Sequence, residues 1–189
     1  MKLTVLGSGS TIPHSKRSSS AYWLETSGGY ILLDCSASAP MRMAQEELPW
    51  PELDAIWISH FHMDHCGGLG PFFAGVKHAE EMKRREKPLT VFGAKGLKKL
   101  ISRFSDVHNY KLLEQPFPVE IREIEPLEKF DILEGVEAVA MSTPHTHESH
   151  AIHLRDYEQT TLVYSADTGF DEIVATFANR VDLFVLECT

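Results

Sequence analysis

The sequence predicts an α/β fold with one hydrophobic core, and three observations support this prediction. The chain has 189 residues, which is enough to fill one core and too few for two domains of ordinary size. Its content of 43% hydrophobic residues is typical of a globular protein. Short segments with the residue preferences of strands are interspersed with segments of helical periodicity. We therefore expect a single domain that covers residues 1–189.

Strand-like segments recur along the whole chain. Residues 21–26 and 30–34 form a predicted hairpin, because the intervening Ser27-Gly28-Gly29 is a turn sequence. The other predicted strands cover residues 2–6, 53–58, 89–92, 119–124, 136–142, 151–154, 161–165 and 181–186.

Helical spacing of apolar residues predicts the remaining elements. Between Leu69 and Val76, large apolar side chains recur at the three- and four-residue intervals of one helix face. The predicted helices cover residues 41–48, 67–76, 94–104 and 171–178.

Charge and hydropathy argue against bulk nucleic-acid binding and against membrane contacts. The chain carries 27 acidic and 18 basic residues, and its net charge of -9 opposes attraction to a phosphate backbone. No apolar stretch approaches the ~20 residues that a membrane helix needs, and the first residues are too short and too strand-like for a signal peptide. These features predict a cytoplasmic protein.

The cysteine content does not indicate a disulfide framework or a cysteine zinc site. The chain has three cysteines without C-x-x-C spacing, Cys35, Cys66 and Cys188, and we expect buried free thiols. Cys66 directly follows His65, so a thiolate ligand to a metal is the alternative at that position.

A dense group of potential metal ligands, S-H-F-H-M-D-H-C-G-G, occupies residues 59–68 after the apolar run 55–58. The polar residues and paired glycines predict a strand that opens into a loop and not a helix. Residues two apart in extended backbone face the same way, so His60 and His62 can approach one metal. Asp64 continues along that side and His65 points elsewhere, so one loop can serve two metals. A solvated polar turn is the alternative.

Two further candidates lie at predicted strand ends. His145 follows the strand 136–142, and Asp167, in the segment Y-S-A-D-T-G, follows the strand 161–165. Asp167 could instead cap a turn. Three more histidines could compete with His145 for its role: His147, His150 and His153.

These segments resemble the metallo-β-lactamase superfamily. H-F-H-M-D-H is similar to its H-x-H-x-D-H signature, T-P-H-T-H-E-S-H-A-I to its H-x-x-x-S-x-x-[IV] segment, and S-A-D-T to its S-G-D-T segment. The N-terminal G-S-G-S, Pro13 and R-S-S-S resemble the ribonuclease Z-like branch. The resemblance implies an αββα sandwich, in which two mixed sheets lie between outer helices and bind up to two metals.

The resemblance also implies roles for individual residues. His60, His62 and His145 would hold one metal, Asp64 and His65 the other, and Asp167 would bridge them, so Asp64 and Asp167 are the predicted catalytic residues. Asp34, at the end of an apolar strand, would brace the metal loop, which is the segment 59–68, unless it only caps a turn or helix. Imidazole with carboxylate suits Zn²⁺ best, one or two per chain, with Mn²⁺ or Fe²⁺ as alternatives. A metal-bound hydroxide would then attack a phosphorus or carbonyl centre.

The sequence departs from the ribonuclease Z-like pattern near its last residues. Glu187-Cys188-Thr189 matches an E-[AC]-T-like segment, but the histidine that follows this segment in that branch is missing. We therefore expect a C-terminally shortened chain, in which the second half of the sandwich and the second metal site are incomplete. Substitute ligands such as His147 or His14 would come from loops, and the exposed last strand could form a homo-oligomer.

The spacing of the ligands bears on the substrate. His145 and Asp167 are 167 - 145 = 22 residues apart, which leaves room for a hairpin and no tRNA-gripping arm, so the spacing argues against whole tRNA as the substrate. A small-molecule or short phosphodiester is favoured, because Lys16 or Arg17 could pair with phosphate oxygens. The alternatives are hydrolysis of a lactone, thioester or sulfate ester, and metal binding without catalysis.

Overall fold

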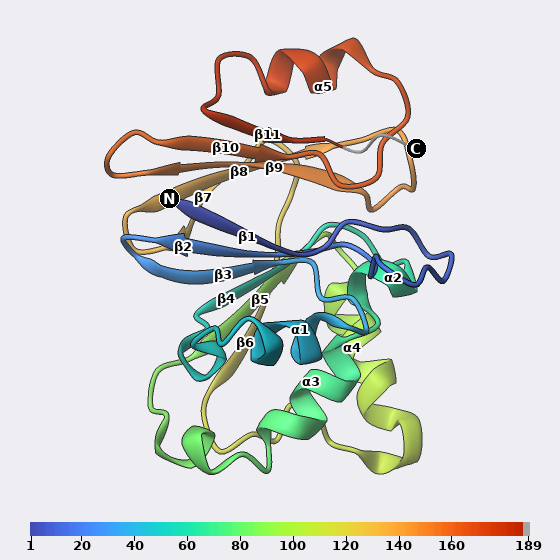
Figure 1. Cartoon of the computed structure of the whole chain (residues 1–189), viewed down its shortest axis with the longest axis vertical. Coiled ribbons are helices and arrows are strands. Elements are labelled where there is room, and N and C mark those ends of the chain that lie inside the picture. Colours follow the sequence, from blue (N-terminus) through green and yellow to red (C-terminus); the bar gives the residue numbers. More distant parts are fainter. Residues whose placement is uncertain (187–189) are drawn as a thin grey trace.

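The computed structural model describes residues 1–186 as two mixed β-sheets stacked face to face, with helices on both outer faces (Figure 1). The first sheet has the strand order β1 (Lys2–Gly7), β2 (Ala21–Thr26), β3 (Gly29–Leu33), β4 (Ala55–Ile58), β5 (Leu89–Gly93) and β6 (Val119–Glu123). The second has the order β11 (Leu183–Val185), β10 (Thr161–Tyr164), β9 (His150–Asp156), β8 (Val136–Ser142) and β7 (Lys129–Leu133).

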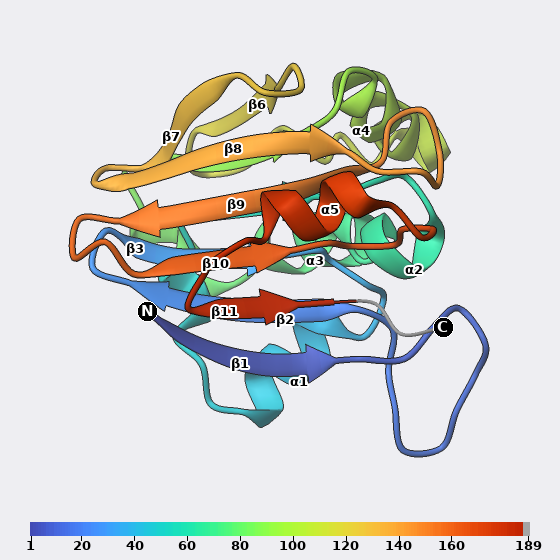
Figure 2. The same ribbon diagram turned by 90° about the horizontal axis from the view of Figure 1, so that it is seen from above.

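The helices complete the αββα order that the resemblance implied. Figure 1 shows the outer face of the first sheet covered by α1 (Ala39–Gln45), α3 (Leu69–Val76) and α4 (Leu97–Asp106). Seen from above in Figure 2, α5 (Glu172–Phe177) lies across the second sheet. Short 3₁₀ turns occupy Trp50–Glu52, Glu80–Arg84 and Val107–Asn109. The predicted fold class is therefore confirmed.

Strand β4, which leads into the candidate ligands of residues 59–68, is apolar throughout. It pairs in parallel with β3 and β5, and all four of its residues are buried. Ile56 and Ile58 join the core between the first sheet and its helices, whereas Ala55 and Trp57 join the core between the two sheets. A strand that is covered on both faces has a continuous run of hydrophobic residues in its sequence, as residues 55–58 do.

The core between the sheets draws on alternate residues of the antiparallel strands. Val136, Ala138 and Ala140 of β8 and two residues of β9, Ile152 and Leu154, are all buried there. Period-two alternation puts their neighbours on the other face of the sheet. This packing fixes how the second sheet sits on the first, and hence how its strand ends meet those of β3 and β4.

The structure corrects one expectation about secondary structure and adds one strand. Residues 63–66 form a short helix, α2 (Met63–Cys66), and not an irregular loop. The backbone N–H of Cys66 donates to the His62 carbonyl at 3.0 Å, and that of Gly67 to Met63 at 2.8 Å. Strand β7 was not predicted, although its alternation K-F-D-I-L is a strand signal.

The remaining predicted elements are present with ends shifted by a few residues, and the predicted strand 136–142 agrees with β8 at both ends. Within residues 1–186, no helix is long and apolar enough to cross a membrane. The predicted segment Glu187-Cys188-Thr189 lies outside the described residues.

Candidate metal centre

The six predicted metal ligands meet where strands of both sheets end. His60 and His62 follow β4, and α2 carries Asp64 and His65. The other two come from the second sheet: His145 from the turn between β8 and β9, and Asp167 from the segment after β10. His60 and His65 are buried and form the floor, while His62 and His145 are exposed at the rim.

Three imidazole rings and one carboxylate form the first group of this centre. His62 Nδ1 lies 3.1 Å from both His60 Nε2 and His145 Nε2. Asp167 Oδ2 lies 3.8 Å from His60 Nε2 and 3.6 Å from His145 Nε2. A tetrahedral ion with ligand bonds of about 2.0–2.1 Å separates its ligand atoms by about 3.3–3.4 Å. The donor set and its spacing therefore fit Zn²⁺ or a similar divalent ion.

A second group forms around His65. Its Nε2 lies 3.1 Å from Asp167 Oδ1 and 3.8 Å from Asp64 Oδ2. The two oxygens of Asp167 thus face the two groups separately. In the helical turn of α2, Asp64 and His65 both direct side chains into this region, whereas strict alternation would have turned them to opposite sides.

Asp34 is the buried carboxylate on which the site is built. It follows β3 and has a positive φ of 58°. Its Oδ1 accepts the backbone N–H of Ser59 at 2.8 Å, and its Oδ2 accepts the Ser59 hydroxyl at 2.8 Å, His65 Nδ1 at 2.6 Å and the Tyr164 hydroxyl at 2.6 Å. One carboxylate therefore joins the metal loop to β10 of the other sheet.

These contacts orient two of the predicted ligands. Since the Ser59 hydroxyl donates to Asp34, Ser59 Oγ accepts from His60 Nδ1, which lies 3.0 Å away. His65 Nδ1 donates directly to Asp34. Both rings thus turn Nε2 towards the centre, because a hydrogen bond at one ring nitrogen determines what the other can do.

Burial and charge give the buried histidines opposite protonation states. Burial lowers the pKa of His60 to about 4, and the nearby positive charge of His65 adds to this effect. Burial also disfavours protonated His65, but the charges of Asp34 and Asp167 and hydrogen bonds to both raise its pKa to about 10. Burial opposes ionisation of Asp167, but its contacts with His65 lower the pKa of this carboxyl. His60 is therefore a neutral lone-pair donor at neutral pH, whereas His65 has to release a proton before its Nε2 can bind a metal.

The competing candidates lie elsewhere. Cys66 is buried, its Sγ donates to the Phe61 carbonyl at 3.3 Å, and burial raises its pKa to about 12, so it is a thiol. His147 is exposed. His150 is buried, and its backbone N–H donates to the Ser59 carbonyl. The His153 ring lies 5.9 Å from the ring of Phe177. The structure brings only His145 of these four histidines into the group with His60 and His62.

Sequence reasoning missed Ser59 and Tyr164. Ser59 directly precedes His60, and its position before the ligand motif was the available signal. Tyr164 lies 130 residues from Asp34 in the sequence, so no local pattern connects the two.

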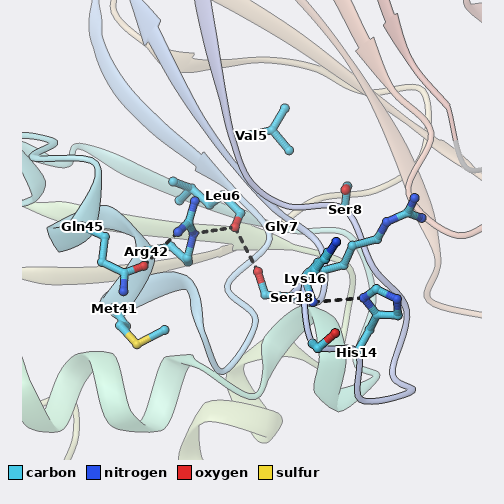
Figure 3. Close-up of a pocket in the computed structure, with 12 residues that line it drawn as sticks. Val5, Leu6, Gly7, Ser8, His14, Lys16, Ser18, Met41, Arg42 and Gln45 are labelled. Carbon is cyan, nitrogen blue, oxygen red and sulfur yellow. Dashed lines mark hydrogen bonds between the residues drawn. The ribbon is translucent and has the colours of Figure 1, made fainter.

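A cavity of about 380 Å³ lies beside the N-terminal loop (Figure 3). It is lined by β1, α1 and the segment that carries His14, Lys16 and Arg17. Arg42 of α1 donates to the Leu6 carbonyl, while no ion pair within residues 1–186 engages Lys16 or Arg17. Lys16 and Arg17 give this cavity positive charge.

Comparisons with known proteins agree with this geometry. The family model described as "Anti-Pycsar protein Apyc1" matches residues 1–189. A ribonuclease Z from Methanosarcina mazei is 30% identical over 148 residues, which cover 77% of this chain and 45% of that relative. The chain spans less than half of the length of the first curated relatives that it matches.

Two solved structures share the fold. The metallo-beta-lactamase fold protein YhfI from Bacillus subtilis has a TM-score of 0.78 and 21% identity, over 99% of this chain and 71% of that one. The short form of human tRNase Z has a TM-score of 0.82 and 20% identity, over 97% and 76%. The chain therefore belongs to the Anti-Pycsar protein Apyc1 family, in the ribonuclease Z-like branch of the metallo-β-lactamase superfamily.

Proposed function

We propose that this protein is a metal-dependent hydrolase that acts on a small or short phosphodiester. The observation that carries the proposal is the convergence of three imidazole nitrogens with Asp167, whose second oxygen faces His65. Curated relatives named ribonuclease Z add support for phosphodiester chemistry.

In this proposal His60, His62 and His145 hold one divalent ion, most favourably Zn²⁺, and Asp64 and His65 hold a second. Asp167 faces both groups and is ionised at neutral pH. The bound ions would lower the pKa of coordinated water and offset phosphate charge. Asp34 holds the floor of the site through Ser59 and His65, and the exposed rings of His62 and His145 flank the side from which substrate enters.

The charge and topology of the chain favour a small substrate over whole tRNA. The 21 residues between His145 and Asp167 contain the antiparallel pair β9 and β10 and no long inserted arm. The net charge of -9 opposes extended nucleic acid, while Lys16 and Arg17 offer local positive charge to a single phosphate group.

Hydrolysis assays on purified protein test this proposal. With added Zn²⁺ or Mn²⁺, we expect turnover of bis-p-nitrophenyl phosphate and of a dinucleotide, loss of turnover with a chelator, and little cleavage of a tRNA precursor. Turnover confined to lactones, thioesters or sulfate esters would contradict the phosphodiester assignment. Tight metal binding with no turnover on any of these substrates would contradict the assignment as a hydrolase.

A further inference from the structure

Thr143 is a buried polar residue that the proposed reaction does not use. It directly follows the last residue of β8, lies two positions before His145 and is 5% exposed. A hydroxyl in such a buried residue normally has a hydrogen-bond partner. The Thr143 hydroxyl donates to the backbone carbonyl of Asp167 at 3.1 Å. A side chain next to one candidate ligand therefore binds the backbone of another.

The backbone of Thr143 holds the segment that carries His145. The Thr143 carbonyl accepts the N–H of His145 at 2.9 Å, and the Thr143 N–H donates to the Ser149 carbonyl at 3.0 Å. The second of these bonds closes the turn between β8 and β9. Both backbone groups and the side chain of Thr143 thus have partners, so this residue has one defined place at the end of β8.

A second contact links the same two ligand segments. The N–H of Gly169 donates to the carbonyl of Pro144 at 2.9 Å. A Cβ at position 169 would lie 3.1 Å from that carbonyl oxygen, so the two backbones approach more closely than most side chains would allow. Consecutive residues of the turn, Thr143 and Pro144, therefore hold the chain at Asp167 and just after it.

The backbone just before Asp167 shows why such contacts matter. Ala166 is buried and has a positive φ of 53°, in the left-handed region that residues with a Cβ adopt only when their surroundings hold them there. Its carbonyl accepts the Ser165 hydroxyl at 2.8 Å, and the next carbonyl along the chain is the one that Thr143 binds. The Thr143 hydrogen bond therefore opposes a relaxation of the backbone that would move the carboxylate of Asp167.

This carboxylate is sensitive to movement because it faces both groups of the centre. Its Oδ2 lies 3.6 Å from His145 Nε2, and its Oδ1 lies 3.1 Å from His65 Nε2. Bond lengths at a metal tolerate deviations of only about 0.2 Å. A small rotation of the segment would thus move both oxygens away from positions that suit bound metal.

We infer that Thr143 is a positioning residue that sets the place of the Asp167 carboxylate relative to His145. This inference rests on the metal site of the proposed function. Loss of groups that orient metal ligands typically weakens metal binding 10–100-fold. T143V keeps the shape of the side chain and lacks the hydroxyl, and we expect a loss of about tenfold, because Thr143 acts on the backbone of the ligand. T143S keeps the hydroxyl and should retain the parent affinity.

The chain offers a matched control in Thr26, at the hairpin between β2 and β3. Its hydroxyl donates to the Gly29 carbonyl at 2.9 Å, so T26V removes the same kind of hydrogen bond. Gly29 begins β3 and Asp34 directly follows that strand, about 17 Å away by strand rise. T26V should therefore lower the melting temperature without changing the metal site.

The experiment measures Zn²⁺ affinity by competition with a chromophoric chelator, the absorption spectrum of the Co²⁺-loaded protein, and the melting temperature of each metal-free variant. We expect weaker Zn²⁺ binding and an altered Co²⁺ spectrum for T143V, and neither change for T143S or T26V. If T143V does not fold, T143A, which removes the same hydroxyl in a smaller side chain, takes its place in the comparison with T143S.

Parent-like Zn²⁺ affinity and Co²⁺ spectrum in T143V would overturn the positioning role and leave the proposed function intact. An equal loss of affinity in T143S would overturn it too, because the hydroxyl would then not be responsible. The same conclusion would follow from an equal loss in T26V, since the effect would then follow general stability. A parent chain that binds no Zn²⁺ would overturn the metal site and with it the inference.

Discussion

Replacement of Tyr164 by phenylalanine tests the central role of Asp34. The Tyr164 hydroxyl donates to Asp34 Oδ2 at 2.6 Å in a site where both residues are almost fully buried. Burial and the adjacent charge of Asp34 raise the pKa of Tyr164 well above its usual value, so the hydroxyl remains a donor at all ordinary pH values. The substitution removes one of three donors to Oδ2 and keeps the ring.

Hydrogen bonds to charged groups contribute about 1.5–3 kcal/mol, and the free energy of unfolding should fall by about this amount in Y164F. For a chain of this length, each 1 kcal/mol corresponds to a shift in melting temperature of about 2–4 °C. A loss of about 2 kcal/mol thus predicts a decrease of about 4–8 °C. Zn²⁺ affinity should also fall about tenfold, because Asp34 orients His65 and, through Ser59, His60.

Tyr22 provides the matched control. Its ring lies 5.2 Å from that of Tyr164, but among the described residues Asp34 accepts hydrogen bonds from Ser59, His65 and Tyr164 and not from Tyr22. Y22F should therefore cost about 0.5–1.5 kcal/mol in stability and leave metal affinity unchanged. Chemical denaturation and Zn²⁺ titration of both variants would check the prediction. Equal effects of Y164F and Y22F on metal affinity would refute the reasoning that Asp34 transmits the change.

Three further predictions concern residues of the site itself. H62A should lose most of its tightly held metal, because His62 Nδ1 lies beside both other imidazoles of the group. H147A, which changes an exposed histidine, should keep the metal content of the parent protein, and elemental analysis of both variants checks this. D167A should lower kcat at least about 100-fold with little change in KM, and D171A, which removes the α5 cap, should not; an unchanged kcat in D167A would make Asp167 a turn residue. R17A should raise KM for a phosphodiester about tenfold at parent metal content, and an unchanged KM would remove this residue from substrate binding.

The sequence predicted most of the strands and brought forward all six candidate ligands because both depend on local patterns. Period-two alternation and strand ends are visible in a short window, as for β8 and His145. Helix α2 was not predictable in this way, since four residues are too few for a helical period. Its polar residues suggested a loop, whereas its hydrogen bonds to His62 and Met63 close one helical turn.

The supporting residues could not be predicted because their roles depend on contacts between the sheets. Tyr164 meets Asp34 only when β10 of the second sheet stacks over the first sheet. In the sequence, Tyr164 is one residue of a mostly apolar strand. Three-dimensional packing, and not residue type, distinguishes it.

The origin of the ligands implies how the site is held together. The first sheet supplies His60, His62 and the α2 ligands, while the second supplies His145 and Asp167. Hydrogen bonds cross between the sheets beside these ligands, from Tyr164 to Asp34 and from the His150 N–H to the Ser59 carbonyl. Thr143 of the second sheet also donates to the Asp167 carbonyl at 3.1 Å, which ties its two ligand segments together. The spacing of the candidate metal ligands is therefore set by the register between the sheets, so that substitutions in this polar seam should act on metal binding before they act on the overall fold.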